Sequence, residues 1–450
     1  MNASDPTDKD RYPTLTDAGR RMLRHMIEHP AAPTFRNKSG NRLTAPEVEA
    51  LRDFESETLT AAVSWRPCEP PHWVPEFMQQ VFADVPHYRT LGSPPRRFED
   101  VPTVDRGDLA ADIARFVPDS VSTERLINFR TTGTTGQPLL VASHPVVAAR
   151  YLAFHKRALR RFGVTLSHGR GQVGVVLLGH QRKCFTYVSV TPSMDESGLA
   201  KINLHPDDWR APEDRVRYLE ALAPEVLAGD PISFAELARL PLTISPKALI
   251  SVSMSLSPGL RRLLVERFAC PVLDVYSMNE VGPVGVFDAA AGGHVMLQPR
   301  LYVEVIGNDD RPVAAGQRGE ITVTGGFNFC LPLLRYRTGD HGVLVQGTDA
   351  PVIAALSGRA PVRFRGGDGR WFNNIDASHA LASIPLSRFG LHQEVDGSLV
   401  LRLAPQELRW SDSASAALQS LIAGAVLRVD AIEQPDKFVQ YTSDLDTALA

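Results

Sequence analysis

The residue types best suited to chemistry in this chain gather in four short segments. The first is TTGTTGQP, at residues 131–138. Its glycines permit backbone conformations that a side chain would forbid, and its N–H groups and hydroxyls could form a concavity for a polyphosphate. It is not the GxxxxGK[ST] phosphate loop, because Gln137 and Pro138 stand where Lys and Ser or Thr are required. Taken alone, an ordinary Thr/Gly turn explains the segment equally well.

The second segment, DVYSMNEVG at 274–282, has the pattern of a strand end, with Glu280 four residues after Tyr276. A tyrosine ring can stack on a purine, and a carboxylate can hold a hard cation such as Mg²⁺. A buried tyrosine beside a surface glutamate is the ordinary alternative. The two types together still indicate a candidate nucleotide site at the end of this strand.

The third and fourth segments contain a turn carboxylate and a group of arginines. RYRTGDHG, at 335–342, places Asp340 in a glycine-flanked turn, where it could accept hydrogen bonds from ribose hydroxyls. GRAPVRFRGG, at 358–367, places three arginines among glycines and suits a joint with phosphate or ribose contacts. The alternatives are an aspartate that only forms the turn and a solvated basic linker.

Composition limits the class of protein. The chain has 450 residues, 43% hydrophobic and 22% charged, enough for a large core and more than one domain. A net charge of −3 gives no strong attraction to nucleic acid, and the four cysteines form no CxxC pattern for zinc. No apolar run approaches the roughly 18–20 residues of a membrane span, and no signal-peptide core is visible. We expect a cytoplasmic protein without nucleic-acid or membrane partners.

Apolar runs alternate with helical patterns between about 125 and 350. Strands are expected at 172–178, 248–254 and 271–278, and helices at 214–223 and after Ser257–Pro258, a capping residue followed by a first-turn proline. LYVEVIG and GEITVTG are expected to be antiparallel strands. Residues 1–13 have a disordered pattern, and 15–59 a helical one. The alternation predicts an α/β protein with largely parallel sheets.

The pattern changes after Gly358. Leucines alternate in SLVLRLAP, and a helix is expected over Ser413–Ala425 before the strand VLRVDAI. We therefore predict a large domain of several subdomains with a helical N-terminal arm at 1–357. A small, mobile α+β domain at 358–450 would be joined to it by a hinge.

The order and spacing of the four segments resemble the adenylate-forming superfamily of acyl-CoA synthetases, peptide-synthetase adenylation domains and luciferases. That family has a Thr/Ser/Gly loop, a Tyr-x-x-Thr-Glu segment, a Tyr-Arg-Thr-Gly-Asp turn and a Gly-Arg hinge. Here YRTGD stands unchanged at 336–340. The closer resemblance is to phenylacetate–CoA ligases and related aryl-acid ligases, through VPHYR at 85–89, VPTVDRGDL at 101–109 and a segment containing His294.

The resemblance implies a role for each matching position. The loop would bind ATP phosphates through Thr131, Thr132, Gly133, Thr134, Thr135 and Gly136, with Thr134 at the reacting phosphate. The nucleotide would also be contacted by Ser253, Asp274, Tyr276, Asn279, Asp340 and Arg359. Glu280 would place Mg²⁺, and Lys437 would bridge the carboxylate and the α-phosphate. The acid would lie against His180, Phe185, Tyr187, Met278 and Gly282.

The implied reaction joins an aromatic acid to AMP, releases pyrophosphate and passes the acyl group to CoA. A homodimer is what the resemblance suggests for assembly. Four departures keep alternatives open: Gln137 in place of the loop lysine, Asn279 in place of threonine, SVSMSLSP at 251–258, and Pro361 after the hinge arginine. The acceptor could instead be an amine, a hydroxyl or a carrier-protein thiol. A nucleotide-binding protein without catalysis is the third interpretation.

Overall fold

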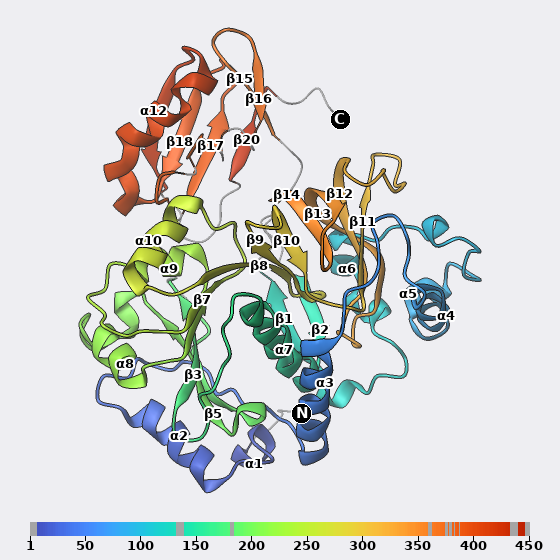
Figure 1. The fold of residues 1–450 in the computed structure, drawn as a ribbon, viewed down its shortest axis with the longest axis vertical. Coiled ribbons are helices and arrows are strands. Elements are labelled where there is room, and N and C mark those ends of the chain that lie inside the picture. The colour runs from blue at the N-terminus through green and yellow to red at the C-terminus, as the bar shows by residue number, and fades with distance from the viewer. Residues whose placement is uncertain are drawn as a thin grey trace.

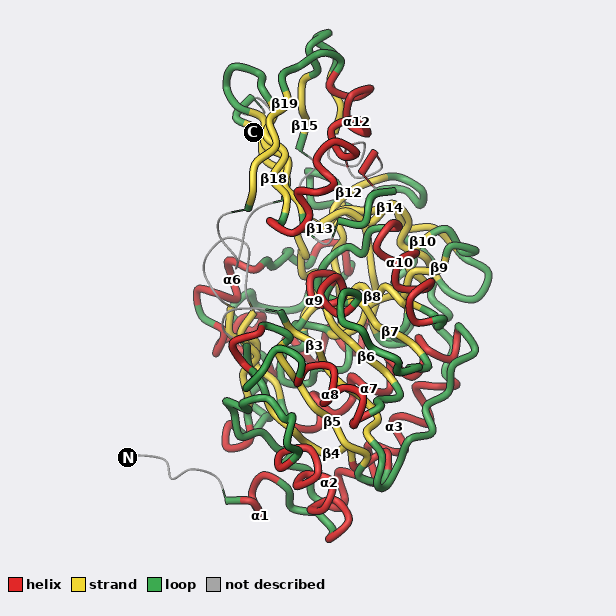
Figure 2. Tube along the Cα trace, turned by 90° about the vertical axis from the view of Figure 1, so that its left-hand side faces the viewer, coloured by secondary structure: helices red, strands yellow, loops and turns green. Residues whose placement is uncertain are grey.

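The computed structural model describes residues 7–131, 139–180, 184–358, 362–373, 377, 380–381, 383–386, 388–432 and 440–445. A large body is built around one sheet, and a smaller C-terminal part lies against one end of it (Figures 1 and 2). The loop residues 132–138, the hinge residues 359–361 and Lys437 lie outside the described residues. Among the described residues, no helix combines the length and apolar character needed to cross a membrane.

The main sheet has 12 strands in the order β11-β12-β13-β14-β10-β9-β8-β7-β6-β3-β5-β4. One half is parallel except for its edge strand β4, which pairs antiparallel with β5. Its strands are β3 (Val173–Gly179), β4 (Tyr187–Thr191), β5 (Ser197–Asn203), β6 (Val226–Gly229), β7 (Ala248–Ser251) and β8 (Val272–Met278). The predicted strand at 248–254 is therefore too long, because Ser253 takes a left-handed φ of 72° and leaves the ladder.

The other half of the sheet is antiparallel and begins where β8 pairs with β9. It contains β9 (Gly282–Asp288), β10 (Gly293–Met296), β11 (Leu301–Ile306), β12 (Arg318–Gly325), β13 (Leu333–Gln346) and β14 (Pro351–Gly358). β11 and β12 are the LYVEVIG and GEITVTG strands, and they pair antiparallel as predicted. β8 is thus the strand that joins the two halves.

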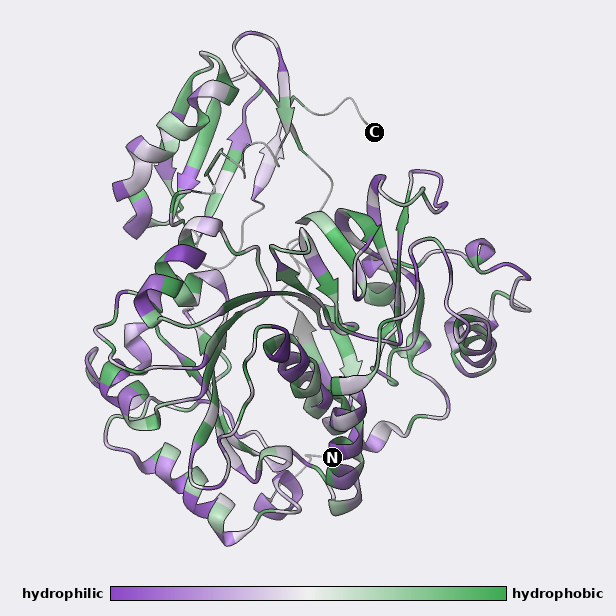
Figure 3. Cartoon of the chain, in the orientation of Figure 1, coloured by the Kyte–Doolittle hydropathy of each residue, from purple (hydrophilic) through white to green (hydrophobic). Residues whose placement is uncertain are grey.

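Helices cover both faces of the parallel half. α7 (Pro145–Arg161) packs on one face, and α8 (Asp214–Leu222), α9 (Pro231–Leu237) and α10 (Pro258–Phe268) pack on the other. Alternate β6 residues serve the two cores: Val226 and Ala228 contact the α7 side, and Leu227 the opposite side. The strands accordingly carry apolar residues on both faces and stand out in the hydropathy colouring (Figure 3). Ser257 caps α10 as predicted, accepting a hydrogen bond from the Leu260 N–H.

The N-terminal arm is more ordered than the sequence predicts. Residues Asp8–Arg11 form a helical turn, α1, capped by reciprocal hydrogen bonds between Thr7 and Asp10. Tyr12 is buried, and its hydroxyl donates to the Val188 carbonyl of β4, which anchors the segment. The expected disorder of 7–13 is therefore wrong, since a capping box and one aromatic anchor suffice to order it. α2 (Asp17–Glu28), α3 (Ala45–Thr60), α4 (Val74–Asp84), α5 (Pro86–Arg89), α6 (Arg106–Ala111) and the hairpin β1 (Ile127–Thr131) and β2 (Leu139–Ser143) complete the region.

The C-terminal part has a core of its own, formed by buried residues between Phe364 and Tyr441. It contains β15 (Arg363–Arg365), β16 (Trp371–Asn373), β17 (Phe389–Gln393), β18 (Leu399–Leu403), α12 (Ser411–Ile422), β19 (Leu427–Ala431) and β20 (Tyr441–Ser443). α12 ends earlier than predicted, because Ala423 adopts a left-handed conformation that ends the helix. The predicted fold class, a large α/β body with a small α+β part, is confirmed. The boundary at 357–358 stays a proposal that this separate core supports.

One buried ion pair organises the antiparallel half. Arg335 of β13 is only 2% exposed, and its guanidinium lies 2.8 Å from the Glu304 carboxylate of β11. Its other nitrogens donate to the carbonyl oxygens of Glu99, Val101 and Asp310, so the side chain ties the 98–101 segment to the sheet. The first arginine of RYRTGD therefore serves the fold.

Replacing Arg335 with Met is expected to lower the free energy of unfolding by about 3–5 kcal/mol, because Glu304 would remain buried without a cation. Urea unfolding followed by tryptophan fluorescence measures the change. The double variant Arg335→Met with Glu304→Leu should recover part of the loss, since it leaves no buried charge. An equal loss in both variants would contradict this account of the ion pair.

Candidate active site

The candidate site lies at the carboxyl edge of the parallel strands. β3, β6, β7 and β8 run in the same direction, so the residues that follow them meet at one edge of the sheet. These residues include His180, Asp230, Ser253 and Glu280. In open α/β sheets, ligands bind in the crevice outside this edge. The C-terminal part approaches the same region, where the Ser257 hydroxyl and the Arg262 guanidinium of α10 donate to the Leu386 and Ser383 carbonyls.

Two of the predicted site residues meet directly. The Tyr276 hydroxyl of β8 donates to the Asp340 carboxylate of β13 over 2.7 Å. The Asp340 N–H donates to the Thr338 hydroxyl, and Gly339 between them takes a φ of 76°, which explains the glycine in this turn. Burial and the facing carboxylate raise the pKa of Tyr276 well above its usual value, so the phenol keeps its proton. The contact fixes the carboxylate at the edge of the sheet.

Glu280 is the buried carboxylate of this region. Its side chain is 6% exposed, and its Oε1 accepts a hydrogen bond from the Tyr336 hydroxyl at 3.2 Å. Burial raises the pKa of the Glu280 carboxyl. Because burial disfavours the negative charge, a bound cation would stabilise the ionised form. Tyr336 is a contact that sequence reasoning missed, although it is the first residue of the YRTGD match.

The backbone around Glu280 is held by three side chains that the sequence did not single out. The Asn328 amide donates to the carbonyl of Glu280, and the Gln298 amide donates to those of Val281 and Pro283 at 2.7 Å. Gly282 takes a φ of 79°, and a Cβ there would lie 2.3 Å from the Phe327 ring. No sequence signal marks these residues, because each acts across long chain separations on main-chain atoms.

A second polar pair includes Asp274, which lies two residues before Tyr276 on β8. Asp274 of β8 and His294 of β10 approach to 3.9 Å, and the His294 ring lies 6.2 Å from that of Tyr276. Burial raises the pKa of the Asp274 carboxyl to about 7. Burial likewise lowers the pKa of His294 to about 4. Both groups are therefore favoured in their neutral forms.

The structure says less about the other residues that are predicted to contact the nucleotide. Ser253 and Asn279 are exposed, and the Asn279 carbonyl accepts from the Tyr151 hydroxyl of α7 at 3.2 Å. Thr131 ends β1. The loop positions Thr132 to Gly136, Arg359 and Lys437 lie outside the described residues, so their roles stay predictions. Met278 and Gly282 flank Glu280 at the end of β8 and the start of β9.

The predicted acid-binding residues separate into two groups. His180 follows β3, its Nδ1 is buried without a hydrogen-bond partner among the described residues, and its ring lies 5.7 Å from that of His205. The rings of Phe185, just before the edge strand β4, and Tyr187, its first residue, have their centres 5.6 Å apart. β4 is five strands from β8, about 24 Å at the usual strand spacing. His180 is therefore nearer to the Tyr276–Asp340 pair than the two aromatic residues are.

Comparison with known sequences finds short, similar segments. Over 108 residues, 23% of this chain, it is 31% identical to phenylacetate–coenzyme A ligase of Escherichia coli (strain K12). Over 107 residues it is 32% identical to the enzyme of the same name from Pseudomonas putida, covering 22% of this chain. The matches span 25% and 24% of those relatives, about a quarter of their length. No family model matches the chain.

Comparison with solved structures extends over most of the molecule. A 2-hydroxyisobutyryl-CoA ligase in the postadenylation state, in complex with 2-HIB-AMP, superposes with a TM-score of 0.59 at 18% identity, covering 89% of this chain and 91% of that one. An open conformation of that ligase, with 2-HIB-AMP and CoA, gives a TM-score of 0.52 over 82% and 89% of the two chains. The chain has the adenylate-forming ligase fold. In this fold the carboxyl-edge site described above is the candidate active site.

Replacing Asp274 with Asn is expected to change how stability depends on pH. In the native protein the Asp274 carboxyl keeps its proton up to about pH 7. In the unfolded chain, where its pKa is the ordinary 3.8, the carboxyl has already lost that proton. The stability that this carboxyl contributes therefore falls as pH rises between these two values. His294 acts oppositely: its native pKa of about 4 lies below the ordinary 6.5, so its contribution rises with pH. The stability advantage of wild type over Asp274→Asn should therefore shrink between pH 4.5 and 7.5.

Urea unfolding at four pH values measures this difference. Asp309→Asn, which alters an exposed turn carboxyl, is the matched control and should follow the wild-type curve. A difference between wild type and Asp274→Asn that does not vary with pH would show that the carboxyl titrates normally in the native protein.

Proposed function

We propose that this protein activates a carboxylic acid with ATP, forming an acyl-adenylate and pyrophosphate, and transfers the acyl group to an acceptor, the thiol of CoA. The observation that carries the proposal is the hydrogen bond joining Tyr276 to Asp340 at the carboxyl edge, in a chain with the adenylate-forming ligase fold. The segment similarity to two phenylacetate–CoA ligases supports the same reaction.

The described residues suit the nucleotide. Asp340, held by the Tyr276 hydroxyl, would accept hydrogen bonds from the ribose, and the Tyr276 ring would border the adenine. Glu280 fits a magnesium ion, because its buried carboxylate has a raised pKa and would be stabilised by a cation. The ion would supply positive charge against the phosphoryl oxygens. Three roles predicted from the sequence remain part of the proposal. They are phosphate binding by Thr131 to Gly136, ribose binding by Arg359, and bridging of the carboxylate and the α-phosphate by Lys437.

An aromatic acid is the proposed substrate. The Nδ1 of His180 at the carboxyl edge, which has no hydrogen-bond partner among the described residues, suits a polar substituent on the substrate's ring. Met278 and Gly282 border the same edge, whereas Phe185 and Tyr187 would contribute only through a longer substrate or a rearrangement of β4. We further propose a cytoplasmic enzyme, with a homodimer as its assembly and no nucleic-acid or membrane partner.

Two alternatives to CoA ligation have specific support. Pro361 after the hinge arginine favours transfer to an amine, a hydroxyl or a carrier-protein thiol. Gln137 in the loop favours a nucleotide-binding protein without catalysis. The retained Tyr276–Asp340 contact and buried Glu280 argue for the catalytic alternative, because binding alone would not require a buried carboxylate beside the site.

Pyrophosphate release with a panel of aromatic acids, including phenylacetate and hydroxy- and aminobenzoates, tests adenylation. We expect release with at least one acid, and a loss of about 10²–10³ in rate for Lys437→Ala, because a cation would leave the reacting phosphoryl group. Lys38→Ala, at an exposed position of the N-terminal arm, is the control. Full activity in Lys437→Ala would remove that lysine from the mechanism, and no release with any acid would remove the proposal.

The acceptor is identified by mass spectrometry of reactions run with and without CoA. We expect an acyl-CoA product only when CoA is present, with acyl-adenylate accumulating in its absence. A stable amide or ester formed without CoA would instead support the first alternative.

A further inference from the structure

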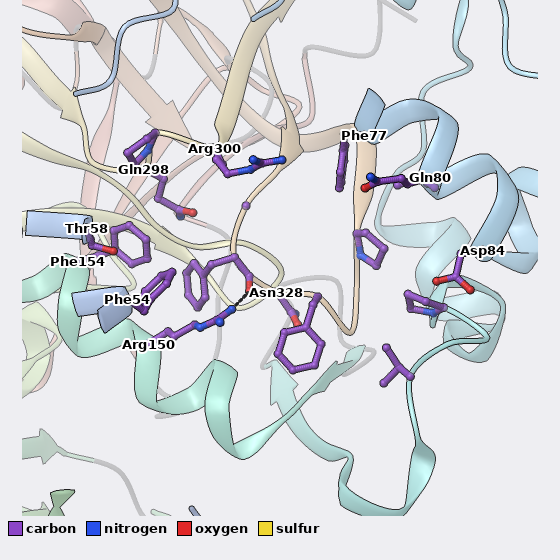
Figure 4. A pocket seen from close by; sticks show the side chains of 18 of the residues that line it. Phe54, Thr58, Phe77, Gln80, Asp84, Arg150, Phe154, Gln298, Arg300 and Asn328 are labelled. Carbon is purple, nitrogen blue, oxygen red and sulfur yellow. Dashed lines mark hydrogen bonds between the residues drawn. The ribbon is translucent and has the colours of Figure 1, made fainter. Parts of the chain in front are cut away.

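A cavity of about 660 Å³ lies between α3, α4 and α7, away from the Tyr276–Asp340 pair (Figure 4). Residues of the segments 118–121, 298–300 and 326–332 also line it. This volume is in the range of small-molecule sites. We propose that the cavity is a second binding site, for a small aromatic monocarboxylate, and that its occupant acts on the neighbouring active site as an effector. The binding itself does not depend on the proposed function.

The walls are suited to an aromatic ring. Phe54 of α3 and Phe154 of α7 line one side, and Phe77 of α4 stands across the space from them in Figure 4. Phe327 continues the first group, with its ring centre 5.0 Å from that of Phe154. Aromatic pairs at such separations offer both the face and the edge of a ring to a ligand. A flat apolar group between these walls would be shielded from water.

Arg150 supplies the positive charge. Its guanidinium lies 4.4 Å from the centre of the Phe54 ring, and its hydrogen bond to the Phe327 carbonyl is long at 3.5 Å. Among the described residues, its buried Nε has no hydrogen-bond partner and no carboxylate pairs with it. A guanidinium that is partly buried with unused donors favours an anion, and a carboxylate matches its planar fork.

A second arginine on the same helix shows what a purely structural role looks like here. Arg157, two turns along α7, also faces α3, and its Nη1 donates to the carbonyl oxygens of Thr58 and Ala61. Those carbonyls lie at the end of α3, so Arg157 caps that helix. Arg150 has no such carbonyl pair among the described residues, and its side chain lines the cavity that Thr58 and Ala61 also border.

The acidic residues at the cavity do not neutralise Arg150. The Asp84 carboxylate accepts hydrogen bonds from the N–H and hydroxyl of Ser120 on the far wall. Glu57 is exposed near the end of α3. Arg300 adds a second guanidinium at the opposite wall, 5.5 Å from the Trp73 ring. A monocarboxylate directed at Arg150, with its ring among the phenylalanines, satisfies this arrangement.

The cavity shares one layer of side chains with the Glu280 segment. Phe327 and Asn328 line it, and the Phe327 ring also presses on Gly282 while the Asn328 amide holds the Glu280 carbonyl. Gln298, another lining residue, holds Val281 and Pro283. An occupant that shifts these side chains would move the Glu280 backbone. This contact makes the cavity an effector site.

Soaking crystals with 4-iodobenzoate tests the site, because the iodine is located by its anomalous scattering. We expect a peak in the cavity with the carboxylate at Arg150, and isothermal titration should show binding weakened about tenfold or more in Arg150→Met, since a charge-assisted hydrogen bond is lost. Arg160→Met, the same change at an exposed position on α7, is the matched control. Iodine found only at the carboxyl edge, or binding unchanged in Arg150→Met, would overturn the proposal.

A second variant tests the site independently in case Arg150→Met does not fold. Phe77→Trp fills the cavity from the opposite wall without touching Arg150, and it should also block binding. Once an acid substrate is known, adding 4-iodobenzoate should change the adenylation rate of wild type and leave Arg150→Met unaffected; equal responses would overturn the effector role. Absence of adenylation altogether would count against the proposed function, while the iodine position would still decide the binding site.

Discussion

The position of β8 between the two halves of the sheet is the constraint on which the site depends. It is parallel to β7 and antiparallel to β9, so its carboxyl end faces both the α/β crevice and the antiparallel strands. The Tyr276 hydroxyl crosses this junction to Asp340, joining residues 64 positions apart in the chain. The parallel half alone would supply the crevice without the Asp340 carboxylate. The antiparallel half alone would supply Asp340 without a ligand-binding edge.

Buried polar groups hold this junction in a fixed geometry. Arg335 and Glu304 tie β13 to β11, and the fixed strand then presents Tyr336 to Glu280 and Asp340 to Tyr276. Each of these groups has a partner, as buried polar side chains require. Arg150 differs from Arg335, because no carboxylate among the described residues pairs with it and it borders the cavity behind the Glu280 segment. Arg335 therefore stabilises the fold through its partners, whereas Arg150 lines a cavity.

Much of the local structure could be predicted. The Ser257–Pro258 cap, the β11–β12 pairing and the strand over 271–278 follow from short-range preferences that the fold did not override. The failures were also local: α1 formed through a capping box and the burial of Tyr12, and β7 stopped where Ser253 turned to a left-handed conformation. In those places, a contact from a distant strand or an unusual backbone angle outweighed residue preference.

The sequence by itself determined which residue types recur in which order, and hence the adenylate-forming resemblance, Tyr276, Glu280 and Asp340 as a candidate set, and the α/β class. Only the tertiary structure decided which of the candidates meet. It joined Tyr276 to Asp340, placed Tyr187 at the start of a distant edge strand with Phe185 just before it, and brought Asn328, Gln298 and Phe327 against the backbone around Glu280. The reason is physical: strand order sets which side chains become neighbours, and it depends on long-range pairing that no short segment encodes.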